Sequence, residues 1–229
     1  MHFQSDIVAP RPHDKKQIAR ELTEWVASPD FPCVGAKAAL RRHQLEILVV
    51  TDIRRSGSDT LITSRLQDFA IRHDNDEKTF VSQAVIFQSN ADLSEEEFET
   101  YLWQRLTSFH VIDRQDFHWD PKVDSDPQSP HFSLSIGGKG FFVVGLHPNA
   151  SRVARRFRYP TLIFNLHAQF EKLREEGRYE TIRNKTIERD IAIQGSANPM
   201  LARHGEASAA AQFSGRRVGN NWKCPFKHG

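Results

Sequence analysis

The alternation of apolar and polar residues along the chain predicts a mixture of helices and strands. Ile18, Leu22 and Trp25 are spaced so that they share one face of a helix over 15–28. Other segments carry short, nearly continuous apolar runs, which are typical of buried strands. The expected strands lie at 45–50, 79–88 and 161–167, and further helices are expected at 33–44, 61–73, 93–113, 168–177 and 179–193.

The order of these elements predicts the fold class. The segment 131–147 is expected to form a hairpin that turns at Gly137, Gly138 and Gly140. A hairpin together with long helical insertions predicts an α+β fold with a mostly antiparallel sheet of about five strands and flanking helices. Residues 1–14 are expected to form a loose arm, and 15–229 a single domain. A long tail from residue 194 is expected to wrap over this domain, anchored by Met200, Phe213, Trp222 and Phe226.

Length and charge exclude several classes of protein. The 229 residues suit one large domain. The formal charge of 31 − 29 = +2 is too balanced for a general nucleic-acid binder. No apolar run could span a bilayer, and the start has no signal-peptide core, so we expect a cytoplasmic protein without a membrane or nucleic-acid partner. In that compartment, Cys33 and Cys224 are not expected to form a disulfide.

An arginine cluster follows the expected hairpin. The segment 147–160 holds four arginines and no acidic residue. If the chain after Pro148 is helical, Arg152, Arg155 and Arg156 lie on one flank, where they repel one another unless an anion joins them. A phosphate, a substrate carboxylate or two haem propionates would suit guanidinium groups. The alternative is a solvated basic face that pairs with distant acids.

Two cysteines require separate explanations. Cys33 precedes an expected helix, whose N–H groups would favour the thiolate, and Lys37 adds positive charge to the same face. Such a thiolate could act as a nucleophile, a redox switch or a metal ligand, whereas the alternative is an inert buried cysteine. Cys224, in "WKCPF", fits a packed tail better than a haem contact.

Two histidines each end an expected strand. His147 ends the hairpin and His167 ends the following strand, so both rings could line one rim if these strands are neighbours. Taken alone, each is more often a structural or surface histidine. The chain has no HExxH and no clustered zinc spacing, and no nucleotide-binding loop supports a nucleotide fold.

Four long segments resemble the YqcI/YcgG family, in the same order and from about Phe31 to Phe226. They are "FPCVGAKAAL", "GKGFFVVGLHPNASRVARRFRYPTLIFNLHAQFEKLR", "ERDIAIQGSANPML" and "QFSGRRVGNNWKCPF". Members of this family include haem-dependent oxygenases that N-hydroxylate guanidino groups such as that of arginine, and many others are uncharacterised. The resemblance therefore implies a monooxygenase that uses b-type haem, molecular oxygen, an electron donor and a small guanidino substrate. Homo-oligomerisation stays open.

The resemblance also assigns expected roles. The iron would take Cys33 or His147, or both in a six-coordinate state, and a thiolate would favour O–O cleavage. Arg152, Arg155 and Arg156 would hold haem propionates or a substrate carboxylate. Ser151 and Lys37 complete the expected haem-binding set.

A guanidine arrives protonated, since its pKa is above about 12, and its pocket should hold a carboxylate. Glu188 and Asp190 in "ERDIAIQG" are the candidates, with helix salt bridges to Arg189 or Arg183 as the alternative. Gln194 follows them and could bind the substrate or hold the tail. Two other functions remain open: a non-catalytic haem sensor or carrier, and an anion-binding module without haem.

Overall fold

The computed structural model describes residues 14–74, 80–89, 92–202 and 205–228. Its centre is a five-stranded sheet in the order β1-β2-β5-β4-β3. Only β1 and β2 pair in parallel, and the other neighbours are antiparallel. The expected α+β fold with a mostly antiparallel sheet of about five strands is therefore confirmed. The strands are β1 Leu45–Val50, β2 Ser82–Phe87, β3 Leu134–Ile136, β4 Lys139–Leu146 and β5 Thr161–Leu166.

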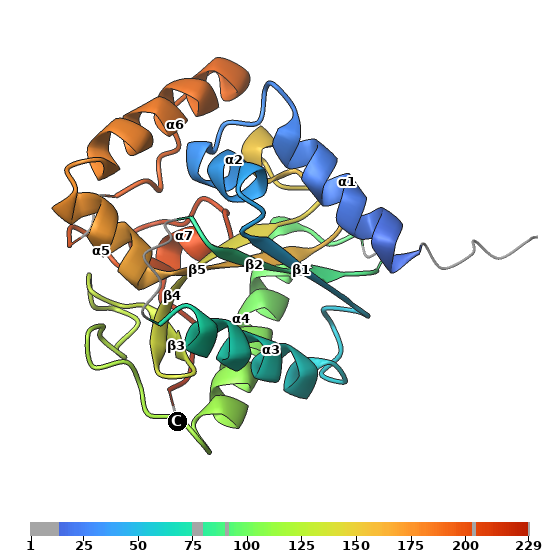
Figure 1. Cartoon of the computed structure of the whole chain (residues 1–229), viewed down its shortest axis with the longest axis vertical. Helices are drawn as coiled ribbons and strands as arrows, with labels where there is room; N and C mark the ends of the chain where they lie inside the picture. Colours follow the sequence, from blue (N-terminus) through green and yellow to red (C-terminus); the bar gives the residue numbers. More distant parts are fainter. Residues whose placement is uncertain (1–13, 75–79, 90–91, 203–204, 229) are drawn as a thin grey trace, which may run out of the picture.

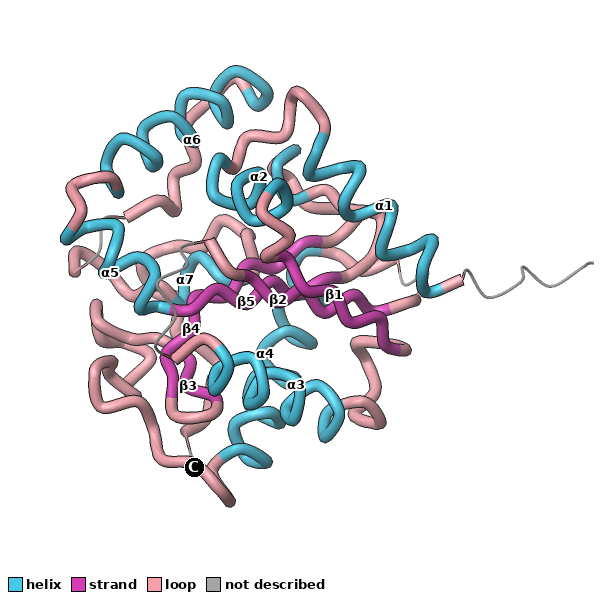
Figure 2. Tube along the Cα trace, viewed as in Figure 1, coloured by secondary structure: helices cyan, strands magenta, loops and turns pink. Residues whose placement is uncertain are grey.

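Helices cover both faces of the sheet (Figures 1 and 2). The helices α3 (Asp59–Arg72) and α4 (Glu95–Asp113) pack against one face. The helices α1 (Lys15–Ala27), α2 (Val34–Arg41) and α6 (Tyr179–Gln194) lie over the other, with α5 beside them. The remaining elements are α5 His167–Glu175, α7 Ala210–Phe213 and the 3₁₀ turn η1 Val153–Arg155. None of the described helices is long and apolar enough to cross a membrane.

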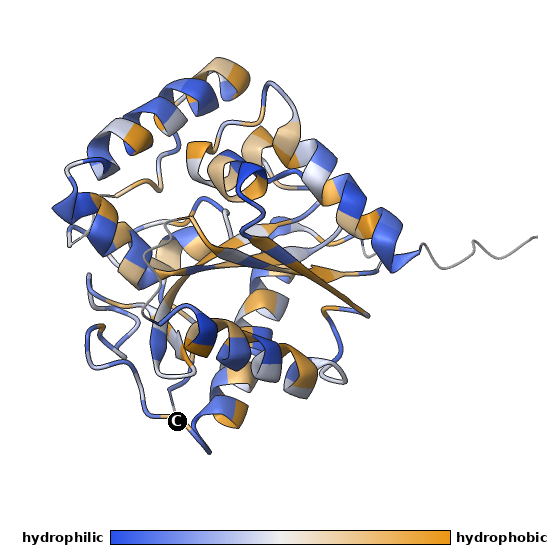
Figure 3. Cartoon of the chain, in the orientation of Figure 1, coloured by the Kyte–Doolittle hydropathy of each residue, from blue (hydrophilic) through white to orange (hydrophobic). Residues whose placement is uncertain are grey.

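The strand β2 shows why the sheet has two packed faces. All six of its residues are buried, and successive side chains point to opposite faces. Val85 and Phe87 join the core under α3 and α4, whereas Ala84 and Ile86 join the core under α1. In Figure 3 the sheet is accordingly mostly hydrophobic, and the outer faces of the helices are more hydrophilic.

The hairpin turns where two glycines allow it. Gly137 and Gly138 have φ values of 61° and 69°, in the left-handed region that favours glycine. Gly140, expected in the turn, is instead part of β4. Its backbone N–H donates to Oδ2 of the buried Asp120 at 2.8 Å, which fixes the start of this strand.

The C-terminal tail wraps over the α4 side of the domain, as predicted. Phe213 stacks on Trp103 of α4 with ring centroids 5.6 Å apart, and Phe226 is also buried. Trp222 packs partly buried against the same core, whereas Met200 does not join it. The carboxylate of Glu99 accepts hydrogen bonds from the Ser214 hydroxyl and the Arg216 guanidinium. Of the expected N-terminal arm, 1–13 lie outside the described residues, and Asp14 caps α1.

Gly145 is the tightest glycine position in the sheet. A Cβ there would lie 2.7 Å from Phe98 Cε1 and 2.9 Å from the Phe213 carbonyl oxygen. We expect Gly145→Ala to lower the free energy of unfolding in urea by about 1–3 kcal/mol, because the core and the tail must move apart. Gly57→Ala is the control, since nothing lies within 4 Å of its Cβ. Equal stability of the two variants would contradict this packing.

Candidate functional site

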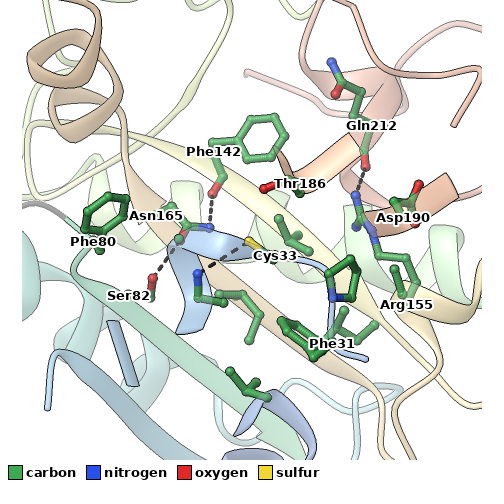
Figure 4. A pocket seen from close by; sticks show the side chains of 18 of the residues that line it. Phe31, Cys33, Phe80, Ser82, Phe142, Arg155, Asn165, Thr186, Asp190 and Gln212 are labelled. Atoms are coloured by element: carbon green, nitrogen blue, oxygen red, sulfur yellow. Dashed lines mark hydrogen bonds between the residues drawn. The ribbon is translucent and has the colours of Figure 1, made fainter. Parts of the chain in front are cut away.

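A large apolar cavity lies between the sheet and the helices on the α1 side (Figure 4). We call it the main chamber; its volume is about 310 Å³, within the range of small-molecule sites. Its floor is formed by side chains of β4 and β5, and its roof by α1, α2 and α6. The apolar lining includes Leu22, Trp25, Phe31, Phe80, Phe142, Val144, Leu146, Ile163, Phe170 and Ile187.

A second cavity of about 280 Å³, the side chamber, adjoins the first beside α5 and α6. Cys33, Gly35 and Phe80 line both chambers, as do Thr186 and several apolar residues of α5 and α6. Because so much lining is shared, the two chambers form one extended pocket. Cys33 lies where they meet.

The position of Cys33 is set by the start of α2. It is the N-cap residue, and its Sγ accepts a hydrogen bond from the Ala36 N–H at 3.4 Å. Next to it, the Val34 N–H donates to Thr186 Oγ1 at 3.3 Å, which ties α2 to α6. Burial raises the pKa of the Cys33 thiol, although the backbone N–H groups and the charge of Arg155 oppose this rise. The thiol is therefore protonated in the pocket until a stronger positive charge or a metal ion binds.

Lys37 does not face the pocket. Its ammonium group donates to the carbonyl oxygens of Ser28 at 2.5 Å and Pro29 at 3.1 Å, so it closes the loop between α1 and α2. The predicted haem-binding role of Lys37 has no support in this geometry.

The arginines after β4 diverge, because only the short turn η1 is helical there. A helix after Pro148, which would have placed the three arginines on one flank, is absent from the described residues. Arg152 forms a buried ion pair with Asp190 of α6. Arg156 turns back to the carbonyl oxygens of Ala150 and Ser151. Neither side chain is available to bind an anion as expected, since Asp190 neutralises Arg152 and Arg156 hydrogen-bonds to the backbone of its own loop.

Of the two arginines that line the main chamber, Arg155 is the one without a carboxylate partner among the described residues. Its Nη1 donates to the Gly145 carbonyl oxygen at 3.0 Å, and its Nη2 to that of Gln212 at 3.2 Å. No described carboxylate hydrogen-bonds to it. Burial lowers the pKa of Arg155 to about 10, partly opposed by the nearby Cys33 and Asp190. A buried guanidinium that meets only neutral oxygens would gain from an anionic ligand.

Of the expected catalytic residues, only Asp190 lines the pocket. It is 7% exposed, and its Oδ1 has no hydrogen-bond partner among the described residues, while Oδ2 meets Arg152. Glu188 points to solvent and pairs with Lys185 at 2.9 Å. The prediction of Glu188 as a substrate ligand is therefore not supported, because its side chain projects from the side of α6 that faces away from the pocket.

Gln194 and Ser151 hold loops together. The Gln194 side chain accepts from the Val153 N–H at 2.8 Å, joining the end of α6 to η1. Ser151 donates through its N–H and its hydroxyl to Glu95 Oε1, at 2.9 and 2.8 Å, on the exposed surface. Neither residue is part of the pocket lining, so their expected contacts with substrate or haem have no support here.

The two histidines lie at opposite ends of the sheet. The strands β4 and β5 are neighbours, but they run antiparallel, so their last residues cannot share a rim. His147 stacks on Phe98 at 4.4 Å outside the pocket, and burial lowers its pKa to about 4. His167 lines the side chamber, where its ring nitrogens contact Ser133 Oγ at 3.2 Å and Glu171 Oε1 at 2.9 Å. Cys33 and His147 therefore do not point into a common site.

Sequence reasoning missed several polar residues of the pocket, among them Asn165, Gln169 and Arg183. Asn165 interrupts the apolar run of β5 and accepts from Ser82 Oγ at 2.7 Å, and this interruption was a signal in the sequence. Gln169 donates to the Val81 carbonyl oxygen at 3.2 Å and leaves its own buried Oε1 without a partner. Arg183 lines the side chamber. The last two belong to helices and carry no distinctive motif.

The family model of the YqcI/YcgG family matches residues 22–227. This span covers most of the chain, including every pocket residue named above, so the chain belongs to the YqcI/YcgG family. No curated protein and no solved structure matches this chain. The described residues contain no group of three or more histidine, cysteine and acidic side chains that could hold a metal ion.

The proximity of Arg155 and Cys33 predicts a coupled titration. Removing the guanidinium charge in Arg155→Met should shift the pKa of Cys33 further upward, since that charge favours the thiolate. The readout is the pH midpoint of Cys33 alkylation by iodoacetamide, resolved by mass spectrometry on the purified protein. Arg156→Met is the control, because its guanidinium serves only the loop. An unchanged or lower midpoint in Arg155→Met would exclude the coupling.

Proposed function

We propose that this protein is a haem-dependent monooxygenase that N-hydroxylates a guanidino group of a small nitrogen compound. Molecular oxygen and an electron donor are the co-reactants. Beside the family membership, one observation supports the proposal: a cysteine thiol and an uncompensated arginine face the same apolar pocket. The thiol suits iron, the arginine suits a carboxylate, and the walls suit a porphyrin ring.

The residues present fit a b-type haem, with Cys33 as the axial ligand. His147 lies outside the pocket, and both ring nitrogens of His167 are engaged by Ser133 and Glu171. The raised pKa of Cys33 is no obstacle, because a coordinated metal ion deprotonates a thiol. Arg155 would bind a propionate or a substrate carboxylate. When bound, the haem would supply oxygen activation, which thiolate ligation favours.

Asp190 would orient the substrate. Its Oδ1 is a carboxylate oxygen without a partner in the pocket wall, and such a buried acceptor is costly unless a donor reaches it. A guanidinium offers several N–H donors in one plane. The ion pair with Arg152 fixes the carboxylate from its other oxygen. Asp190 could therefore hold the substrate and take a proton from its guanidinium, which would make the nitrogen more nucleophilic, while the apolar walls exclude water.

A second candidate is a non-catalytic haem carrier or sensor. Its support is the charge around Asp190, where Arg152 and Arg155 outnumber the single acid. A net positive site favours an anion such as a propionate over a cationic substrate. Turnover with a guanidine distinguishes the two functions.

The cofactor can be tested on its own. Protein expressed with a haem supply should give a positive pyridine haemochrome, and its reduced carbon monoxide complex should show the red-shifted Soret band of thiolate ligation. Cys33→Ser should lose that band, whereas His147→Leu should keep it because His147 stacks outside the pocket. Haem-free wild-type protein after supplemented expression would refute the cofactor.

The reaction can be tested with haem-loaded protein, oxygen and a reductant. We expect a guanidine product heavier by one oxygen atom that derives from molecular oxygen. Asp190→Asn should lower kcat/KM by about 10–100-fold, because a charge-assisted hydrogen bond contributes about 1.5–3 kcal/mol.

Glu188→Gln is the matched control, since it removes an acid from the outer side of the same helix. If the haem-loaded wild type oxidises no guanidine or amine of a broad panel, the carrier or sensor function is favoured instead.

A further inference from the structure

Three positively charged side chains gather at the loop between α1 and α2. Lys37 donates its ammonium protons to the carbonyl oxygens of Ser28 and Pro29. The Arg189 guanidinium of α6 donates to the same Pro29 oxygen at 2.5 Å. Arg41 lies one helical turn after Lys37 on α2, so it shares the same face, and it is exposed. Among the described residues, no carboxylate hydrogen-bonds or ion-pairs with any of the three cations.

We call Lys37, Arg41 and Arg189 the basic surface. Its charges are close enough to act on one another. Burial lowers the pKa of Lys37, the charges of Arg189 and Arg41 lower it further, and Asp30 opposes them. Three positive charges therefore face one nearby acid, and the loop carbonyl oxygens compensate them only in part. A surface of this kind attracts an acidic partner and steers its approach.

The basic surface lies close to Cys33 along the chain. Arg189 also donates to the Phe31 carbonyl oxygen at 3.1 Å, and Phe31 lines the main chamber. Two residues of extended chain span at most about 7 Å, so the Cys33 Cα lies within that distance of the Phe31 Cα. In Figure 1 the loop lies between α1 and α6, on the side of these helices that is away from the sheet. A protein docked on this loop would come near the sulfur without entering the pocket.

We propose that the basic surface docks the electron donor, and that this donor is a small protein with an acidic surface. The inference rests on the proposed function, which consumes two electrons and two protons for each oxygen molecule: one oxygen atom enters the guanidine and the other leaves as water. In each encounter the donor is oxidised by one electron and the haem iron is reduced by one. Because Lys37 and Arg189 direct N–H groups at the loop carbonyls, the surface offers charge rather than a cradle of donors. Such charge suits an acidic protein better than a small anion.

The test uses Arg41, because Lys37 and Arg189 also hold the loop and their loss would disturb Cys33. The probe is an acidic iron–sulfur ferredoxin of the plant type, reduced in advance and mixed with haem-loaded protein under carbon monoxide in a stopped-flow spectrometer. The change in the Soret band reports the rate of haem reduction. At about 10 mM ionic strength, Arg41→Glu should lower the second-order rate constant about tenfold, since it reverses one charge of the surface. At about 1 M salt the difference should vanish, because the Debye length is then about 3 Å.

Arg65→Glu is the matched control, because Arg65 is an exposed arginine of α3, on the opposite face of the sheet. Photoreduced deazariboflavin, a neutral reductant, should reduce the wild type and both variants at the same rate. Equal rate constants with ferredoxin for Arg41→Glu and Arg65→Glu at low salt overturn the inference. Calorimetry that shows Arg41-dependent binding of inorganic phosphate, with no effect of Arg41→Glu on ferredoxin, also overturns it, because the surface is then a small-anion site.

Failure of the proposed function gives a different result, because haem reduction needs no guanidine. If the wild type oxidises no guanidine yet takes electrons from ferredoxin in an Arg41-dependent way, the docking surface stands and the reaction is rejected. If the protein binds no haem, calorimetry of ferredoxin binding at low salt replaces the rate measurement. Binding that Arg41→Glu weakens about tenfold keeps the surface, and equal binding or none rejects it.

Discussion

The partly buried guanidinium of Arg155 is the constraint on which the pocket depends. It joins the carbonyl oxygen of Gly145 in β4 to those of Gln212 and Phe213 in the tail. A charge taken out of water is costly unless it is compensated, and carbonyl dipoles compensate it only in part. The lowered pKa of Arg155 expresses this deficit. The contact that attaches the tail to the sheet therefore also leaves an unsatisfied positive charge beside the cavity.

The positive charge of Arg155 could stabilise either of two anions in the pocket. A Cys33 thiolate and a ligand carboxylate would both be stabilised by Arg155, yet one guanidinium cannot fully compensate two anions. An anion bound at Arg155 would therefore disfavour the thiolate, unless iron supplies its own positive charge.

The sequence predicted which segments form helices and strands better than it predicted how the strands run and where the side chains point. The strands and most helices follow from local periodicity, and the cysteine at a helix start follows from Pro32 and the apolar turn after it. The antiparallel course of β4 and β5, which separates His147 from His167, depends on long-range pairing. The divergence of Arg152, Arg155 and Arg156 depends on the short η1 turn, which no local pattern predicts.

Helix phase could have resolved one ambiguity in advance. Glu188 and Asp190 are two residues apart, so a helix turns them to different sides and only one could face a pocket. Which side faces inward depends on Thr186 and Ile187, which contact the pocket from the same face as Asp190.

Phe80 keeps the two chambers joined at some conformational cost. Its φ of 75° is unusual for a bulky residue and costs on the order of 1–3 kcal/mol, so the surroundings must hold it there. Its ring packs over Gly35, where an added Cβ would lie 3.4 Å away, and under the Arg42 guanidinium at 5.4 Å. Because Gly35 also borders Cys33, any larger side chain there would fill the space beside the sulfur. A small residue and a strained aromatic ring thus maintain open space next to the thiol, which is the condition for a ligand to reach the sulfur.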